Sequence, residues 1–195
     1  MNIGIDVDGV LANFNEQFIE RIIGITGEDK FPPRPFDIPT WHYPQVYGYT
    51  DEQMGLTNGP VWTSIRHDPT FWAMLPAYSW TANVLRRLHA LQHEHAIYFI
   101  TDRAGIAVKR QTESWLRSRN FDRATVLISS QKALCAQALK LDVYVDDRYE
   151  NAESVGSTSP TTQTFLLTQP WNVTYPPGHY QRIDSPLDVF KILAL

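Results

Sequence analysis

Short apolar runs that alternate with segments of helical spacing are the feature that most constrains the fold of this chain. The runs are rich in β-branched residues, which is typical of buried strands, and Ile3–Val7 is the first of them. Strands that alternate with helices predict an α/β fold with a parallel sheet covered on both faces. Further strands are expected at Ala96–Ile100, Thr125–Ile128, Val143–Val145 and Thr164–Leu167, and helices at Thr81–Leu91, Ala107–Arg119, Lys132–Lys140 and, capped by Ser185, Pro186–Leu193.

The stretch from residue 26 to residue 78 interrupts this alternation. It holds prolines at short intervals and many aromatic residues, so it cannot form one long regular element. We therefore predict a Rossmann-like core of residues 1–13 and 79–195, with residues 14–78 forming a small helical cap inserted after the first strand. A helix that follows the first strand and its turn is predicted from the helical spacing of Leu11, Phe14, Phe18 and Ile22.

The composition is that of an ordinary soluble globular protein, with 195 residues, 43% hydrophobic and 19% charged. A formal net charge of −4 supplies no basic face, so we expect no stable nucleic-acid binding and a small-molecule partner instead. The first residues lack the pattern of a signal peptide, and no apolar run approaches the length of a membrane span. Because the single cysteine, Cys135, also fits a reducing compartment, we expect a cytoplasmic protein without a membrane partner.

The segment Asp6-Val7-Asp8-Gly9-Val10 carries the strongest chemical signal. Asp-Gly between apolar residues is also a common hairpin turn, but the residues that follow have helical rather than alternating spacing. Two carboxylates therefore come at the carboxyl end of a strand, which is where open α/β sheets place their sites.

Three later strands are also followed, or ended, by residues with polar or charged side chains. Thr101 closes the second strand, Lys132 opens a helix after the third, and Asp146 and Asp147 close the fourth. Each alone has a structural explanation: Thr101 could cap a helix, Lys132 could be a solvated surface charge, and the acidic pair could cap a helix or bind Arg148.

Taken together, these strand ends would meet at one edge of the sheet. The carboxylates of Asp6, Asp8, Asp146 and Asp147 would then repel one another strongly unless a cation and Lys132 neutralised them. Ligands that are all oxygen favour Mg²⁺ over zinc or copper, so we expect Mg²⁺ as the cofactor.

The order of these motifs resembles the four-motif signature of the haloacid dehalogenase (HAD) superfamily of phosphotransferases. Within that superfamily the chain is similar to the 5′(3′)-deoxyribonucleotidases. The similarity covers most of the chain and is carried by Asp6-Val7-Asp8-Gly9-Val10-Leu11-Ala12, Phe71-Trp72-Ala73-Met74-Leu75-Pro76, Asp146-Asp147-Arg148 and Gln169-Pro170-Trp171-Asn172.

The resemblance implies a Mg²⁺-dependent phosphatase with an aspartyl-phosphate intermediate. By motif, Asp6 would be the nucleophile, and Asp8 would protonate the leaving oxygen and then activate water. Mg²⁺ would be held by the Asp6 carboxylate, the Asp8 backbone carbonyl and Asp147, with Asp146 in support.

The same resemblance implies a substrate site. Thr101 and Lys132 would bind the phosphoryl oxygens. A wall for a nucleobase would be formed by Phe14, Trp41 and Trp62, although each of these aromatics alone could equally be core of the cap.

The chain departs from the nucleotidase pattern in two places. Asp102 and Arg103 stand where that family has a serine, often followed by proline, and Ser130-Gln131 precede Lys132 where the family tends to have Arg-Asp. Arg103 becomes a candidate substrate-binding residue, and we expect it to pair with Asp102, because a further acid near a phosphate site would otherwise be unfavourable. Both changes leave the reaction type alone and affect the choice of substrate.

The predicted function is hydrolysis of a phosphate monoester, with a deoxyribonucleoside monophosphate as the expected substrate. Three alternatives stay open: a phosphatase for another small phosphate, a phosphatase for a nucleic-acid 3′ phosphate, and a non-catalytic nucleotide-binding domain. The acidic charge balance weighs against the second, and the intact acidic and lysine motifs weigh against the third. The sequence leaves the oligomeric state open, with a homodimer among the alternatives.

Overall fold

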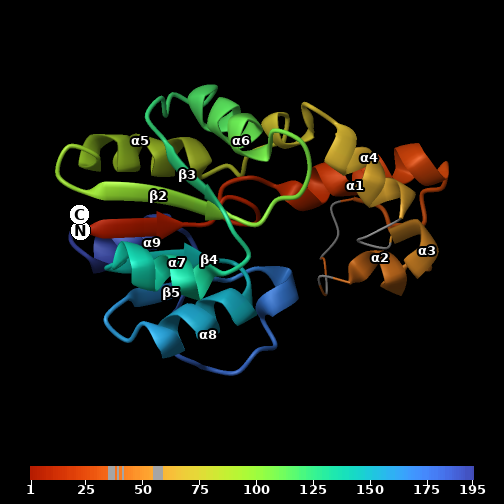
Figure 1. Ribbon diagram of the computed structural model, residues 1–195. Helices are drawn as coiled ribbons and strands as arrows, with labels where there is room; N and C mark the ends of the chain where they lie inside the picture. The colour runs from red at the N-terminus through yellow and green to blue at the C-terminus, as the bar shows by residue number, and fades with distance from the viewer. Residues whose placement is uncertain (35–37, 39, 41, 55–58) are drawn as a thin grey trace.

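A parallel β-sheet forms the centre of the protein in the computed structural model, which describes residues 1–195 except 35–37, 39, 41 and 55–58 (Figure 1). Within the described residues the sheet has six strands, all parallel, in the order β3-β2-β1-β4-β5-β6. The strands are β1 (Asn2–Ile5), β2 (Ala96–Thr101), β3 (Thr125–Ile128), β4 (Val143–Asp146), β5 (Gln163–Leu167) and β6 (Gln181–Ile183). The predicted α/β class with a parallel sheet is confirmed.

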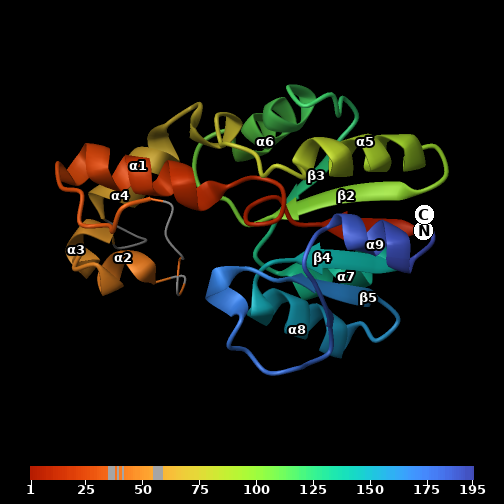
Figure 2. The same ribbon diagram turned by 180° about the vertical axis from the view of Figure 1, so that it is seen from behind.

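Helices cover both faces of this sheet, because side chains of successive strand residues point to opposite faces. Ile100 and Tyr144 pack with α7 and α8, whereas their neighbours Phe99, Val143 and Val145 belong to the core on the opposite face. That second core includes residues of α5, α6 and α9 (Figures 1 and 2). The five helices are α5 (Thr81–Leu91), α6 (Val108–Arg117), α7 (Lys132–Leu139), α8 (Tyr149–Thr158) and α9 (Leu187–Ile192).

A group of short elements follows β1 and lies beyond the carboxyl ends of the strands (Figure 2). Its first helix begins at Phe14, because the Asn13 side chain accepts a hydrogen bond from the backbone N–H of Glu16 and caps the helix. Gly27 ends that helix in the left-handed conformation. The elements are α1 (Phe14–Thr26), α2 (Tyr43–Val46), α3 (Asp51–Met54), α4 (Pro60–His67) and the 3₁₀ helix η1 (Phe71–Ala73).

Most predicted elements agree with the structure to within two residues at each end. The assignment of Leu11 to the first helical pattern is wrong, because its backbone N–H instead closes a turn onto Val7 O. Neither α8 nor β6 was predicted from the sequence. None of the described helices is long and apolar enough to cross a membrane.

Candidate active site

Three buried carboxylates meet where β1 and β4 end. One carboxylate oxygen from each of Asp6, Asp146 and Asp147 lies within 4.8 Å of the others. Gly9 allows this approach: its φ of 77° suits glycine, and a Cβ at this position would overlap the Asp147 carboxylate. The loop after β1 can therefore lie directly against the end of β4.

Lys132 provides the positive charge nearest to this cluster. Its Nζ lies 3.1 Å from Asp6 Oδ1 and 3.9 Å from Asp146 Oδ2, and it also donates to Ile100 O. Burial lowers the pKa of Lys132, but the adjacent carboxylates of Asp6 and Asp146 outweigh burial and raise it overall, so the ammonium stays charged.

At Asp6, in contrast to Lys132, burial has a larger effect on the pKa than the neighbouring opposite charge. Burial raises the pKa of Asp6 to about 7; Lys132 opposes the shift, and the carboxylates of Asp146 and Asp8 add to it. Lys132 therefore does not offset the combined effect of burial and the two neighbouring carboxylates on the pKa of Asp6.

Asp147 is the least satisfied member of the cluster. Its Oδ2 accepts a hydrogen bond of 3.0 Å from Trp171 Nε1, but its buried Oδ1 has no partner among the described residues. Burial, then the charges of Asp146 and Asp6, raise the pKa of Asp147 well above its usual value. A buried carboxylate oxygen without a partner, beside two further carboxylates, fits a hard divalent cation such as Mg²⁺.

Asp146 differs from its neighbour because both of its oxygens are hydrogen-bonded. Oδ1 accepts from Arg148 N at 2.8 Å, and the Asn151 amide lies 3.1 Å from both oxygens. The Tyr144 hydroxyl donates to Oδ2. Asp146 is thus oriented by its own partners, whereas Asp147 keeps one oxygen available.

Asp8 lies beside the cluster and is held by Arg103. The guanidinium donates from Nε to Asp8 Oδ2 at 2.8 Å and from Nη2 to Asp8 Oδ1 at 2.7 Å, and its Nη1 donates to Thr112 at 2.8 Å. Thr101 also donates to Asp8 Oδ2, at 3.2 Å. The expected pairing of Arg103 with Asp102 is wrong, because the guanidinium points inward while Asp102 is exposed at the mouth of the site.

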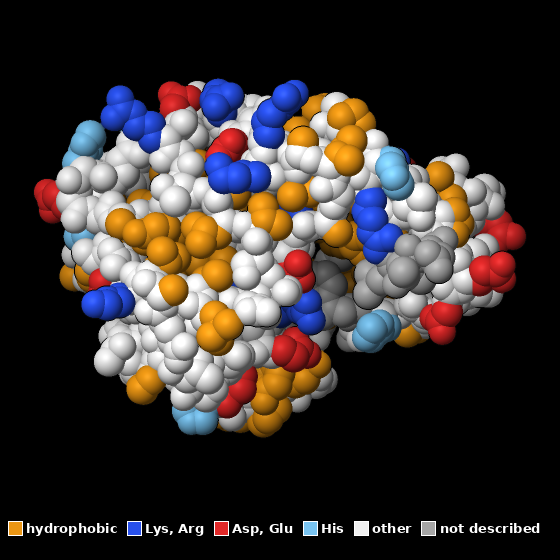
Figure 3. Space-filling model, viewed as in Figure 1, with side chains coloured by type: hydrophobic (Ala, Val, Ile, Leu, Met, Phe, Trp, Pro, Cys, Tyr) orange, Lys and Arg blue, Asp and Glu red, His pale blue; other side chains and the backbone are white. Residues whose placement is uncertain are grey.

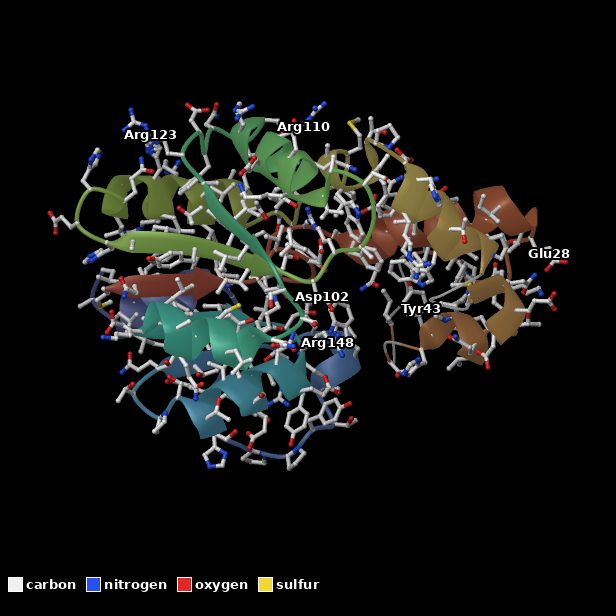
Figure 4. The ribbon with its side chains drawn as sticks, viewed as in Figure 1. Glu28, Tyr43, Asp102, Arg110, Arg123 and Arg148 are labelled. Atoms are coloured by element: carbon white, nitrogen blue, oxygen red, sulfur yellow. The ribbon has the colours of Figure 1, made fainter. Side chains whose placement is uncertain are left out.

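A cavity of about 360 Å³ opens from these acids toward α1, α2 and α4. Figure 3 shows the surface hollowed in this region, and Figure 4 labels Tyr43 on the cap side with Asp102 and Arg148 on the other. The cavity is polar at the sheet, where Asp6, Asp8, Thr101 and Asp147 line it, and apolar toward the cap.

Aromatic rings form the apolar wall. The Phe14 ring stacks on Trp62 at 6.0 Å between centroids and on Trp72 at 5.7 Å, with interplanar angles of 20° and 16°. Phe18 extends the wall at 4.9 Å from Phe14. Trp41, the remaining predicted wall residue, lies outside the described residues.

Several residues of the site were not predicted from sequence. Phe18 and Trp72 belong to the wall, and Trp171 contacts Asp147. The signal for Trp171 was present in the segment that resembled the family: Gln169 there donates to Gly9 O at 2.7 Å, and Asn172 donates to Asp147 O at 2.7 Å. The segment is therefore hydrogen-bonded both to the loop after β1 and to the loop after β4.

Comparison with known proteins agrees with this geometry. Residues 1–194 match the family described as 5′ nucleotidase, deoxy (Pyrimidine), cytosolic type C protein. The chain belongs to this family. The match identifies the protein as a phosphatase enzyme, so the predicted family and enzyme class are confirmed. No curated protein matched the chain.

Solved structures of HAD hydrolases share the fold. A haloacid dehalogenase-like hydrolase from Burkholderia xenovorans has a TM-score of 0.61 at 15% identity, over 99% of this chain and 96% of that one. The HAD-hydrolase YfnB from Bacillus subtilis, solved with magnesium, has a TM-score of 0.62 at 12% identity, over 100% and 98%. A HAD family hydrolase from Deinococcus radiodurans, solved with phosphate and sodium, has a TM-score of 0.57 at 13% identity, over 99% and 94%.

Proposed function

We propose that the chain hydrolyses deoxyribonucleoside monophosphates through a phosphorylated Asp6, with Mg²⁺ as its cofactor. The observation that carries this proposal is the cavity itself, because a buried acidic cluster with an unpartnered Asp147 oxygen lies at one end and a stacked aromatic wall at the other. The family match supports nucleotide chemistry over other phosphate esters.

The metal would be held by Asp6, Asp147 and the Asp8 backbone carbonyl, with Asp146 in support. Bound Mg²⁺ would supply Lewis-acid stabilisation of the negative charge on the phosphoryl group. The magnesium in YfnB supports this choice of ion.

In the proposed reaction, Asp6 is the nucleophile, and Asp8 is first the general acid and then the general base. The Asp6 carboxylate attacks phosphorus and forms a new P–O bond while the bond to the leaving ester oxygen breaks, and Asp8 gives that oxygen its proton. Asp8 then takes a proton from water, which attacks phosphorus and releases phosphate from Asp6. Thr101 and Lys132 hold the phosphoryl oxygens during both steps.

Arg103 would act in this reaction chiefly by holding Asp8. Its side chain has 0% exposed surface, its guanidinium grips both Asp8 oxygens, and its Cζ lies 4.9 Å from the centre of the Trp72 ring. The predicted contact between Arg103 and the substrate remains a prediction, and such a contact would have to be made beside Asp8 and Trp72.

The base would lie against Phe14 and Trp62, while the phosphate occupies the acidic end. We keep residues 14–78 as the proposed cap, because α1 and α4 supply these two rings. A cytoplasmic location, which the family description supports, and a homodimer also remain proposals.

A panel of phosphate monoesters, assayed for phosphate release with Mg²⁺, tests the function. Deoxynucleoside 5′- and 3′-monophosphates should be hydrolysed with higher kcat/KM than ribonucleotides, sugar phosphates, aryl phosphates or a DNA 3′ phosphate. Faster turnover of a sugar phosphate than of every nucleotide would remove the nucleotidase assignment, and binding of nucleotides without any turnover would favour a non-catalytic domain.

A further inference from the structure

Arg182 makes three hydrogen bonds to the segment that follows β5. It lies in the middle of β6, an edge strand that β5 separates from β4. Its Nη1 donates to Asn172 Oδ1 at 3.0 Å, and its Nη2 donates to Asn172 O at 2.8 Å and to Tyr175 O at 3.1 Å. Arg182 is not among the described residues that line the cavity, so it can affect the site only through the residues that it contacts.

Asn172 joins Arg182 to the end of β4. It is 1% exposed, and its Nδ2 donates to Asp147 O at 2.7 Å and to Leu167 O at 2.8 Å. Its Oδ1 accepts from Arg182 and, at 3.2 Å, from Gln169 N. A carboxamide has two N–H donors and two acceptor positions, so all of them are used here. The two donors at the oxygen fix the orientation of the amide and thereby direct its N–H groups at the two main-chain oxygens.

The same segment also contacts groups that we assign to the Mg²⁺ site. Trp171 Nε1 donates to Asp147 Oδ2 at 3.0 Å, so Asp147 is held at both its side chain and its main chain. Gln169 Nε2 donates to Gly9 O at 2.7 Å, next to the backbone carbonyl of Asp8. Mg²⁺ requires nearly ideal octahedral geometry with metal–oxygen distances of about 2.0–2.1 Å, so small displacements of these groups should weaken its binding.

We propose that Arg182 is a positioning residue for the Mg²⁺ site. The inference rests on the metal-dependent part of the proposed function, and it concerns a residue that touches neither the metal nor the substrate. Arg182 holds Asn172, and Asn172 holds the main chain at Asp147, so the carboxylates keep the spacing that the cation needs. The guanidinium is a planar fork whose N–H groups point in fixed directions, whereas a lysine ammonium is a compact donor on a flexible stem. Lysine would therefore keep the charge and lose the paired contacts.

The test measures the Mg²⁺ dissociation constant of the substrate-free protein, in the wild type, Arg182→Met and Arg182→Lys. Mg²⁺ that binds only the folded state raises the melting temperature, and the dependence of this rise on Mg²⁺ concentration gives the constant. Thermal unfolding in chelator measures separately the stability that each substitution removes. The KM for thymidine 5′-monophosphate at saturating Mg²⁺ shows whether substrate binding has changed as well.

Arg119→Met is the matched control. Arg119 is also partly buried and donates to two backbone carbonyls, from Nη1 to Trp115 O at 3.1 Å and from Nη2 to Leu75 O at 2.9 Å. Its Cζ lies 3.9 Å from the centre of the Trp115 ring, and that of Arg182 lies 5.8 Å from the centre of the Tyr180 ring. None of these Arg119 contacts involves the acidic loops, so this substitution should remove stability without an effect on the metal.

Arg182→Met and Arg182→Lys should each raise the Mg²⁺ dissociation constant by about tenfold, as expected when an outer partner of a metal ligand is lost. The KM at saturating Mg²⁺ should stay unchanged. Arg119→Met should lower the melting temperature in chelator and keep the wild-type dissociation constant. If Arg182→Met does not fold, Arg182→Lys decides.

An unchanged constant in either Arg182 variant, or the same increase in Arg119→Met, overturns the inference. A wild type that Mg²⁺ stabilises and that hydrolyses an aryl phosphate but no nucleotide overturns the nucleotidase function, while the role of Arg182 stands. A wild type that Mg²⁺ does not stabilise overturns both the proposed cofactor and the inference.

Discussion

Asp147→Asn is expected to stabilise the metal-free protein while it weakens Mg²⁺ binding. A carboxylate oxygen of Asp147 lies within 4.8 Å of those of Asp6 and Asp146, so one pair of like charges at that distance costs about 3 kcal/mol at an effective dielectric constant of 20. This repulsion energy cannot exceed the free energy of protonating the carboxylate, because a proton would otherwise bind and remove the charge. At pH 7, protonating a carboxyl group whose ordinary pKa is 3.8 costs about 4 kcal/mol. Asparagine should therefore add about 3 kcal/mol, or roughly 6–12 °C in melting temperature for a chain of this size.

Asp146→Asn is the matched control, because the same substitution at the adjacent residue should have the opposite sign. Both Asp146 oxygens accept hydrogen bonds, from Arg148 N, Asn151 and the Tyr144 hydroxyl. An asparagine amide would turn N–H groups toward some of these donors and leave buried groups unpaired. This variant should therefore melt below the wild type.

The assay is thermal unfolding of the wild type and both variants, in chelator and in Mg²⁺, at pH 5 and pH 7.5. The raised pKa values of Asp6 and Asp147 mean that the folded state binds protons more tightly than the unfolded state. The stability that this provides is present at low pH and, for Asp6, is lost as pH rises from about 4 to 7. The gain from Asp147→Asn should consequently shrink at pH 5, and Mg²⁺ should stabilise the wild type most at pH 7.5. If Asp147→Asn melts below the wild type in chelator at pH 7.5, or if Asp146→Asn is the more stable variant, the charge argument is wrong.

Three further results are expected. Asp6→Asn should reduce phosphate release to background with an unchanged fold, and normal turnover by the purified variant would end the covalent mechanism. Trp62→Ala should lower kcat/KM for a deoxynucleotide by about 5- to 150-fold, which corresponds to about 1–3 kcal/mol of base stacking, and should affect a simple aryl phosphate less; equal losses on both substrates would instead indicate a core residue. Arg103→Met should lower the free energy of unfolding by about 3 kcal/mol in a urea titration, because Asp8 loses its ion-pair partner and Thr112 loses one hydrogen bond; an unchanged midpoint would contradict the ion pair as a stabilising contact.

The strand ends of this fold could be predicted because their signals are local. An apolar run that ends in a carboxylate or hydroxyl residue identifies both a buried strand and its carboxyl end, which is enough to find Asp6, Thr101 and Asp146 from the sequence alone. Parallel pairing then requires these residues to meet. By contrast, α8 buries only Ala152, Val155 and Gly156, so its apolar face is too small to stand out as helical spacing.

Residue pairs that are distant in sequence could not be predicted in the same way. Asp8 and Arg103 carry no local sign of each other, and the nearest acid in the sequence, Asp102, misled the expected pairing. The missing partner of Asn15 could not be predicted for a related reason. A polar residue in the first turn of a helix is common, and only the packed structure shows that its side-chain oxygen has no hydrogen-bond partner.

The buried polar atoms that lack a hydrogen-bond partner belong to residues that line the cavity. All three buried side-chain atoms without a partner in the described part of the chain, on Asn15, Tyr43 and Asp147, belong to residues that line it. Of these three residues, Asp147 alone lies within 4.8 Å of two further carboxylates, which is the arrangement that a divalent cation would satisfy. Replacement of Asp147 with asparagine should therefore give greater stability of the free protein together with weaker metal binding, because the charge that destabilises the cluster in the free protein is the one that the proposed Mg²⁺ would neutralise.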